Sequence, residues 1–291
     1  FLGAVAAFLA LAAFYWSWVL VPEVDGTIYY EVMFWGGGHT LQFQHALLMV
    51  VAWLWIAAAL GRPSAASPRA VSVLFLVAAL PLLAVPAIYL LLPVGELPHV
   101  ELFAKLMEWG HPYMGPLILL GALSLWGVRS LPATPARSAF VASFTLFALG
   151  GVLGYMIHGV NVVIPAHYHG STVGVTLAFM GLAYVLLPRL GFGAPEGRMA
   201  LWQPYVYGGG QLIHVLGLAW SGGYGVQRKV AGAEQMLTTL PQKIGMGMMG
   251  LGGLIAVIGG LMFVLVCLKA MSRRRVQAAE KVEQVEKERR A

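Results

Sequence analysis

The sequence predicts an all-α protein, a polytopic transmembrane helix bundle of about eight spans. Of its 291 residues, 59% are hydrophobic and only 10% are charged, and the mean hydropathy is +0.78. Apolar runs of roughly 18 residues or more, long enough to cross a bilayer, recur along the whole chain. Soluble domains do not combine so many such runs with so few charges. We therefore expect an integral membrane protein that contacts lipid along most of its length.

The predicted spans follow one another through short connections. In chain order they cover residues 1–21, 34–60, 70–93, 102–127, 138–158, 165–188, 201–224 and 243–271. Gly, Pro and Ser mark the connections, as in Gly61-Arg62-Pro63-Ser64. We expect a membrane-embedded helix bundle over residues 1–272 and a charged cytoplasmic tail helix over 273–291, where Glu mixes with Lys and Arg at helical spacing. The chain begins inside an apolar run without a basic segment and cleavage site, so we expect further chain upstream rather than a signal peptide.

The charges of the connections predict the orientation. Arg62, Arg129 and Arg189 lie in alternate connections, and a run of arginines begins at Arg273 after the last span, whereas connections on the other side carry acidic residues such as Glu96. Because basic residues concentrate on the cytoplasmic side, both ends of the chain are expected there. The net charge of +6 follows from this topology, and we expect no nucleic-acid partner.

Histidines are the residues that best suit cofactor chemistry. The single cysteine, Cys267, excludes disulfides and cysteine-based metal sites within this chain. The eight histidines are His39, His45, His99, His111, His158, His167, His169 and His214. Most of them fall in the outer half of the predicted bilayer, where clustered neutral imidazoles suit heme or metal ions. We expect His45 and His214, which lie deeper in their spans, to be packing or water-bound residues.

His167 and His169 lie at the start of a predicted span. Residues two apart on a helix point about 200° away from each other, so these two imidazoles cannot bind one metal ion together. Each can instead hold a different planar cofactor on opposite sides of the helix. On spacing alone, two water-facing histidines at the helix end of a transporter are an equally good interpretation.

Two segments together resemble the catalytic subunit of the heme–copper oxidase superfamily. They are Phe34-Trp35-Gly36-Gly37-Gly38-His39 and Ala166-His167-Tyr168-His169. The chain is similar to helices five to twelve of that twelve-helix subunit. The resemblance implies that His39 binds a non-heme metal, His167 a high-spin heme and His169 a low-spin heme. It also implies that His158 and the pair Arg228-Lys229 lie near the heme propionates, which need fixed cations.

The expected metal site departs from the family pattern. The family's adjacent histidine pair is absent, and the segment Pro93–Glu101 takes its place. We expect His99 to be the second ligand of the non-heme metal and His111 to be a candidate third ligand, although His111 is an equally good candidate for a simple hydrogen-bonding residue. Glu101 or Glu108 could add a carboxylate, and such a mixed set suits iron better than copper.

The residue four positions after His39 bears on the substrate. Oxygen-reducing members of the family place a tyrosine there, and well-known nitric oxide reductases place a glutamate, but here it is Phe43, with Gln42 as the nearest polar neighbour. Phenylalanine has no phenolic hydrogen to give, and coupling two NO molecules takes only two electrons. We therefore expect NO reduction to N2O, with O2 reduction as the alternative within the family.

The resemblance also implies cofactors, partners and a location. We expect two hemes and one non-heme iron or copper, and an electron donor of the cytochrome c or cupredoxin type. Upstream helices or a second chain would supply the other axial ligand of the low-spin heme. The expected location is a bacterial or archaeal inner membrane, with the C-terminus in the cytoplasm. A non-catalytic electron-transfer heme protein, which would bind no metal at His39, and a transporter, which would bind no heme, are the alternatives of other classes.

Overall fold

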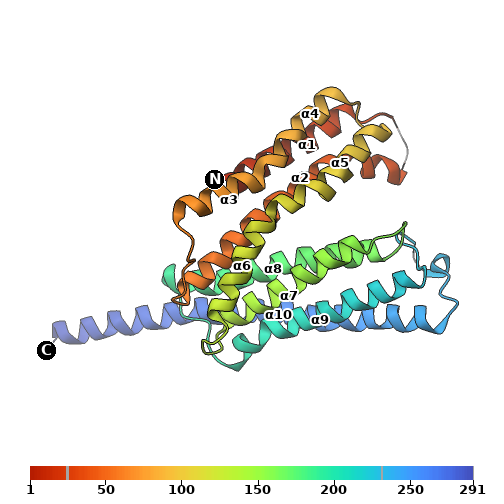
Figure 1. The fold of residues 1–291 in the computed structure, drawn as a ribbon. Coiled ribbons are helices and arrows are strands. Elements are labelled where there is room, and N and C mark those ends of the chain that lie inside the picture. The colour runs from red at the N-terminus through yellow and green to blue at the C-terminus, as the bar shows by residue number, and fades with distance from the viewer. Residues whose placement is uncertain (24–25, 231, 291) are drawn as a thin grey trace. The chain divides into compact units, whose positions relative to one another are not determined.

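The computed structural model describes residues 1–23, 26–230 and 232–290, and it is all-helical over these ranges except for one isolated bridge between Asn161 and Gln227 (Figure 1). This confirms the predicted fold class. The elements are α1 Leu2–Leu20, α2 Gly26–Ala59, α3 Pro68–Ala79, η1 Leu80–Leu83, α4 Ala84–Leu91, α5 Leu97–Gly110, η2 His111–Met114, α6 Gly115–Val128, α7 Pro135–Tyr155, α8 Val163–Arg189, α9 Arg198–Gly223, η3 Gly232–Gln235 and α10 Leu240–Arg290.

All eight predicted spans are helical, and six helical segments of the described residues are long and apolar enough to cross a membrane. They are Leu2–Leu20, Ile28–Ala59, Pro68–Leu91, Pro135–Tyr155, Val163–Arg189 and Leu240–Arg273. The predicted span 102–127 is divided between α5 and α6 by a 3₁₀ turn at Pro112. The predicted span 201–224 coincides with α9, whose glutamines, histidine and glycines lower its hydropathy. The protein is thus an integral membrane protein with the expected helices.

Local sequence signals explain several helix ends. Ser67 and Thr134 cap α3 and α7 by accepting hydrogen bonds from the backbone N–H groups of Ala70 and Arg137. Each cap is followed directly by a proline, which suits the first helical position because its missing N–H is not needed there. At the other end of the chain, α10 continues through the predicted tail to Arg290, and residue 291 lies outside the described residues.

The helices form two compact units, which we describe separately. The first contains residues 1–54 and 62–127. Its core includes the fully buried rings of Phe43, Trp53 and Phe103. A buried hydroxyl chain ties α4 to α1: Tyr89 donates to the carbonyl oxygen of Ala13 (3.0 Å), and its oxygen lies 2.7 Å from the hydroxyl of Ser17.

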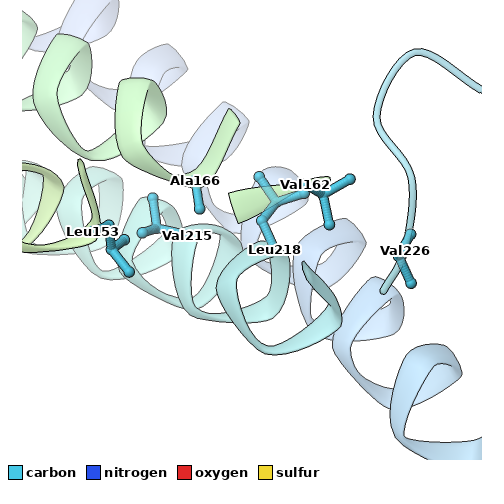
Figure 2. Close-up of a cluster of buried hydrophobic side chains, with 6 residues drawn as sticks. All are labelled: Leu153, Val162, Ala166, Val215, Leu218 and Val226. Atoms are coloured by element: carbon cyan, nitrogen blue, oxygen red, sulfur yellow. The ribbon is translucent and has the colours of Figure 1, made fainter. Parts of the chain in front are cut away.

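The second unit contains residues 55–61 and 128–291. Glycines bring its helices together, since a Cβ on Gly210 or Gly217 of α9 would collide with the backbone of α10. An apolar cluster joins the C-terminal end of α7, the segment leading into α8, and α9: Leu153, Val162, Ala166, Val215, Leu218 and Val226 (Figure 2). Deeper in the unit, the fully buried Gln203 accepts a hydrogen bond from Tyr184 (2.7 Å) and donates to the carbonyl oxygen of Gly259 (3.1 Å). The packed start of α8 is where the histidine pair lies.

Candidate functional site

His167 is held in one orientation by the backbone of α7. Its Nδ1 lies 2.7 Å from the carbonyl oxygen of Gly150. A carbonyl oxygen can only accept, so Nδ1 carries the proton and Nε2 keeps the lone pair that an iron ion needs. Metal-binding histidines commonly have this arrangement, because the second hydrogen bond fixes both the tautomer and the ring. The geometry therefore fits the axial role expected for His167.

Two glycines one helical turn apart on α7 allow α8 to pack closely: Gly154 leaves space for the His167 ring, and Gly150 leaves space for the backbone of α8. A Cβ on Gly154 would lie only 2.9 Å from Nδ1 of His167, and a Cβ on Gly150 would lie 2.4 Å from the backbone nitrogen of Ser171. Between them, Gly151 faces open space. The spacing Gly150-Gly151-x-x-Gly154 is the sequence signal for this slot, and it was visible without the structure.

His169 contacts His214 of α9. Their ring centroids are 4.6 Å apart, with the planes tilted by 58°. His214 in turn places its Nδ1 2.8 Å from the carbonyl oxygen of Met249 in α10. The sequence analysis did not predict this partner, because it depends on how α8 and α9 cross. His214 is half-buried and packs against His169, a predicted heme ligand.

The predicted propionate residues belong to two segments that pair next to the start of α8, where Asn161 bridges to Gln227. A guanidinium nitrogen of Arg228 lies 3.4 Å from the hydroxyl of Tyr168, while its Nε is buried and has no hydrogen-bond partner among the described residues. Lys229 is exposed and has a positive φ of 63°. His158 is also exposed, and its carbonyl oxygen accepts a hydrogen bond from Asn161. The buried N–H of Nε is therefore available to donate a hydrogen bond to an anionic group such as a propionate.

In the first unit, His39 is oriented from within its own helix. Its Nδ1 lies 2.6 Å from the carbonyl oxygen of Trp35, and the Trp35 ring packs against it at 4.5 Å. Trp35 is itself fixed by a hydrogen bond from its Nε1 to the carbonyl oxygen of Val100 in α5. The His39 ring is therefore held in one orientation, and its Nε2 keeps the lone pair that a metal ion would need.

His99 is the most unusual polar residue of this unit. It is fully buried, and neither ring nitrogen has a hydrogen-bond partner among the described residues. Its neighbours are the rings of Tyr89 and Phe103, each 5.1 Å away, and Phe103 also contacts His39 at 6.3 Å. A buried imidazole without partners is costly unless it binds something. His99 thus has a free ring nitrogen that fits a metal ion, and His39 contacts the same phenylalanine, Phe103.

His111 is not brought together with His39 and His99. It stacks on Phe43 at 4.6 Å with an angle of 16° between the planes, and its Nδ1 lies 3.1 Å from the carbonyl oxygen of Met107. Within the described ranges, no three His, Cys, Asp or Glu side chains are grouped closely enough to hold one metal ion. The pairing of His39 with His99, and His111 as a third ligand, therefore stay predictions.

The remaining predicted site residues, apart from Phe43, are exposed. Gln42, Glu101 and Glu108 are all exposed, whereas Phe43 is fully buried. The sequence analysis did not predict Tyr89 as a site residue. A tyrosine hydroxyl inside an apolar span was the signal that could have singled it out. The cavity found in the described residues, of about 80 Å³, is lined by Glu196, Arg198, Lys269 and Arg273, among others, and by no histidine.

Comparisons with known proteins add the wider context. No protein-family model matches the chain. An uncharacterized protein of Rickettsia prowazekii is 29% identical, over 90% of this chain and 60% of that protein. One of Aquifex aeolicus is 31% identical, over 61% of this chain and 43% of that protein. The chain thus spans only 43–60% of the length of these relatives.

A solved structure of a heme–copper terminal oxidase dimer resembles this chain with a TM-score of 0.62 and 16% sequence identity. The alignment covers 93% of this chain and 56% of that one. At this level of identity the likeness concerns the arrangement of the helices. The chain therefore has the fold of a heme–copper terminal oxidase over slightly more than half of that oxidase chain's length.

Proposed function

We propose that the protein is the core of a membrane-bound terminal reductase of the heme–copper oxidase type that reduces nitric oxide. The reaction joins two NO molecules, two electrons and two protons to give N2O and water. The observation that carries the proposal is His99, a fully buried imidazole with two unpaired nitrogens in a protein with an oxidase fold. Apolar packing alone would favour a leucine or phenylalanine at such a position, whereas an imidazole can bind a metal ion such as iron or copper.

The residues at the start of α8 would hold two hemes. His167 would bind the high-spin heme through Nε2 while Gly150 keeps Nδ1 protonated, and His169 would bind the low-spin heme on the other side of the helix. Arg228 and the adjacent Lys229, with His158 from the segment that pairs with theirs through Asn161 and Gln227, would neutralise the propionates. When bound, these hemes and one non-heme iron or copper would supply the redox chemistry, which side chains alone cannot provide.

His39 and His99 would bind the non-heme metal, with His111, Glu101 and Glu108 as further candidates. The ring of Trp35 packs against His39, and the ring of Phe103 contacts both histidines, so these two rings would help to hold the imidazoles in place. Rigid placement of this kind lets two small substrate molecules meet in a productive geometry. The part of this chain is thus to orient ligands.

The choice of NO rests on Phe43. This residue lies one helical turn after His39, is fully buried and stacks on His111, so no proton donor occupies that position. The second candidate function is O2 reduction, and a specific observation favours it. The buried phenol of Tyr89, on another helix, meets the ring of His99 at 5.1 Å and could supply an electron together with its proton.

The proposal extends to partners and location. Electrons would arrive from a cytochrome c-type or cupredoxin-type subunit. The second axial ligand of the low-spin heme would come from upstream helices or a second chain, as expected if the chain spans only part of its relatives. The membrane would be a bacterial or archaeal inner membrane, with both the C-terminus and the charged tail over residues 273–291 in the cytoplasm.

Turnover of the purified full complex with NO and with O2 tests the function. We expect one N2O for every two NO consumed, and we expect this to persist in a Tyr89→Phe variant. The His99→Leu variant should lose activity. Oxygen uptake without N2O formation, abolished by Tyr89→Phe, would establish O2 reduction instead. Bound hemes without turnover of either gas would instead indicate a non-catalytic electron-transfer heme protein.

A further inference from the structure

We propose that His214 positions His169 as a heme ligand by accepting the ring N–H that His169 must carry when its other nitrogen binds iron. This inference rests on the proposed function, which makes His169 the ligand of the low-spin heme. The direct observation is the contact between the two rings, 4.6 Å between centroids and tilted by 58°. Both residues belong to the second unit, and each lies on a well-packed helix.

The hydrogen bonds around the pair define which nitrogen can accept. Nδ1 of His214 lies 2.8 Å from the carbonyl oxygen of Met249, so Nδ1 is the protonated nitrogen and Nε2 holds a lone pair. An imidazole that binds a metal through one nitrogen almost always donates its other N–H to an acceptor. For His167 this acceptor is the carbonyl oxygen of Gly150. For His169, the ring packed against it is His214, which has an acceptor nitrogen to offer.

Helix packing holds His214 at this place. A Cβ on Gly252 of α10 would lie 2.3 Å from the backbone nitrogen of His214, and a Cβ on Gly253 would lie 3.4 Å from its Nδ1. These two glycines let α10 come close enough for the carbonyl of Met249 to fix the imidazole. The resulting relay runs from a backbone carbonyl of α10 through His214 of α9 to His169 of α8.

The same distance argues against His214 as the opposite axial ligand. Two imidazoles on opposite sides of one metal are separated by two metal–nitrogen bonds of roughly 2 Å each, plus the distance from each nitrogen to its ring centre. This sum exceeds the observed 4.6 Å. His214 would therefore act behind His169 rather than as a second ligand opposite it.

The test compares His214→Leu with His214→Gln in the purified full complex. Glutamine can still donate to the carbonyl of Met249 and accept from His169, whereas leucine can do neither. His45→Leu, at a half-buried histidine of α2 without an assigned role, is the control. Each variant is examined by redox titration and by electron paramagnetic resonance of the low-spin heme, at measured heme content.

An accepted N–H gives the ligand more imidazolate character, which favours ferric iron. We therefore expect His214→Leu to shift the ferric–ferrous equilibrium roughly tenfold toward the ferrous form, equal to a potential about 59 mV higher. His214→Gln should restore most of this shift, and His45→Leu should cause none. Loss of the low-spin heme in His214→Leu, with retention in His214→Gln, would equally support the role.

Two results would overturn the inference. The first is an unchanged potential and spectrum of the low-spin heme in His214→Leu. The second is conversion of that heme to a high-spin spectrum in both variants, which would make His214 a ligand. Failure of the proposed function would be seen separately, in wild-type protein that contains no heme or that contains heme but does not reduce NO.

Discussion

Substitution of Gly154 by alanine tests the heme slot between α7 and α8. A methyl group there would lie 2.9 Å from Nδ1 and 3.0 Å from Cε1 of His167. Nonbonded atoms prefer roughly 3.5 Å or more, so the ring would have to move by about half an ångström. That movement pulls Nδ1 away from the carbonyl oxygen of Gly150, now 2.7 Å away. The variant therefore disturbs the ligand without touching the heme directly.

The magnitude follows from the clash. Overpacking of this kind costs about 1–3 kcal/mol, which corresponds to about 5-fold to 150-fold weaker binding of a heme that requires the original ring position. Alanine also raises helix propensity by about 1 kcal/mol relative to glycine. Gly151→Ala is the matched control, because it gains the same propensity while its methyl group meets nothing within 4 Å.

The assay is heme content and the optical spectrum of the high-spin heme in the two variants, purified side by side. We expect Gly154→Ala to lose high-spin heme or to show a displaced spectrum, and Gly151→Ala to match wild type. The low-spin heme should remain in both. Equal heme content and identical spectra in the two alanine variants would refute the reasoning that His167 is a heme ligand fixed by this slot.

Three further predictions concern other residues. His99→Leu should stabilise the metal-free protein by about 1–3 kcal/mol, because it removes two unpaired buried nitrogens. The same variant should abolish binding of the non-heme metal. A lower melting temperature of the metal-free variant than of the metal-free wild type would contradict the stability prediction. Arg228→Gln should lower the heme midpoint potentials, because a cation near the propionates favours the reduced state, and unchanged redox titrations would argue against that placement. Tyr184→Phe should destabilise the protein by about 1–3 kcal/mol, because it leaves the buried Oε1 of Gln203 unpaired; thermal unfolding measures this, and the heme spectra should not change.

The helices were predictable because the membrane imposes a simple rule on sequence. Apolar runs long enough to span a bilayer must be helical, since the backbone has no water to bond with. The predicted span 165–188 accordingly lies within α8, Val163–Arg189. Proline marked the irregular places, as at Pro81, where a 3₁₀ turn separates α3 from α4, although the sequence does not say whether a helix kinks or breaks there.

The site was only partly predictable. The motif around His167 and His169 singled out these two histidines, but the role of Gly150 and Gly154 beside His167 came only from the structure. Two contacts could not be predicted: His169 with His214, and His99 with Tyr89. Each joins two helices, and no local sequence pattern says which residues meet where helices cross. His111 stacks on Phe43, and among the described residues no three His, Cys, Asp or Glu side chains lie close enough together to hold one metal ion.

The most direct test of the account is a count of hemes and metals in the complete protein purified from membranes. Heme is measured by pyridine hemochrome, and total iron and copper by mass spectrometry. We predict two hemes and one further iron or copper per chain, with the further metal lost in His99→Leu and both hemes retained. Absence of heme from the wild-type protein, or two hemes with no additional metal, would contradict the central claim that these histidines build a heme and metal reductase site.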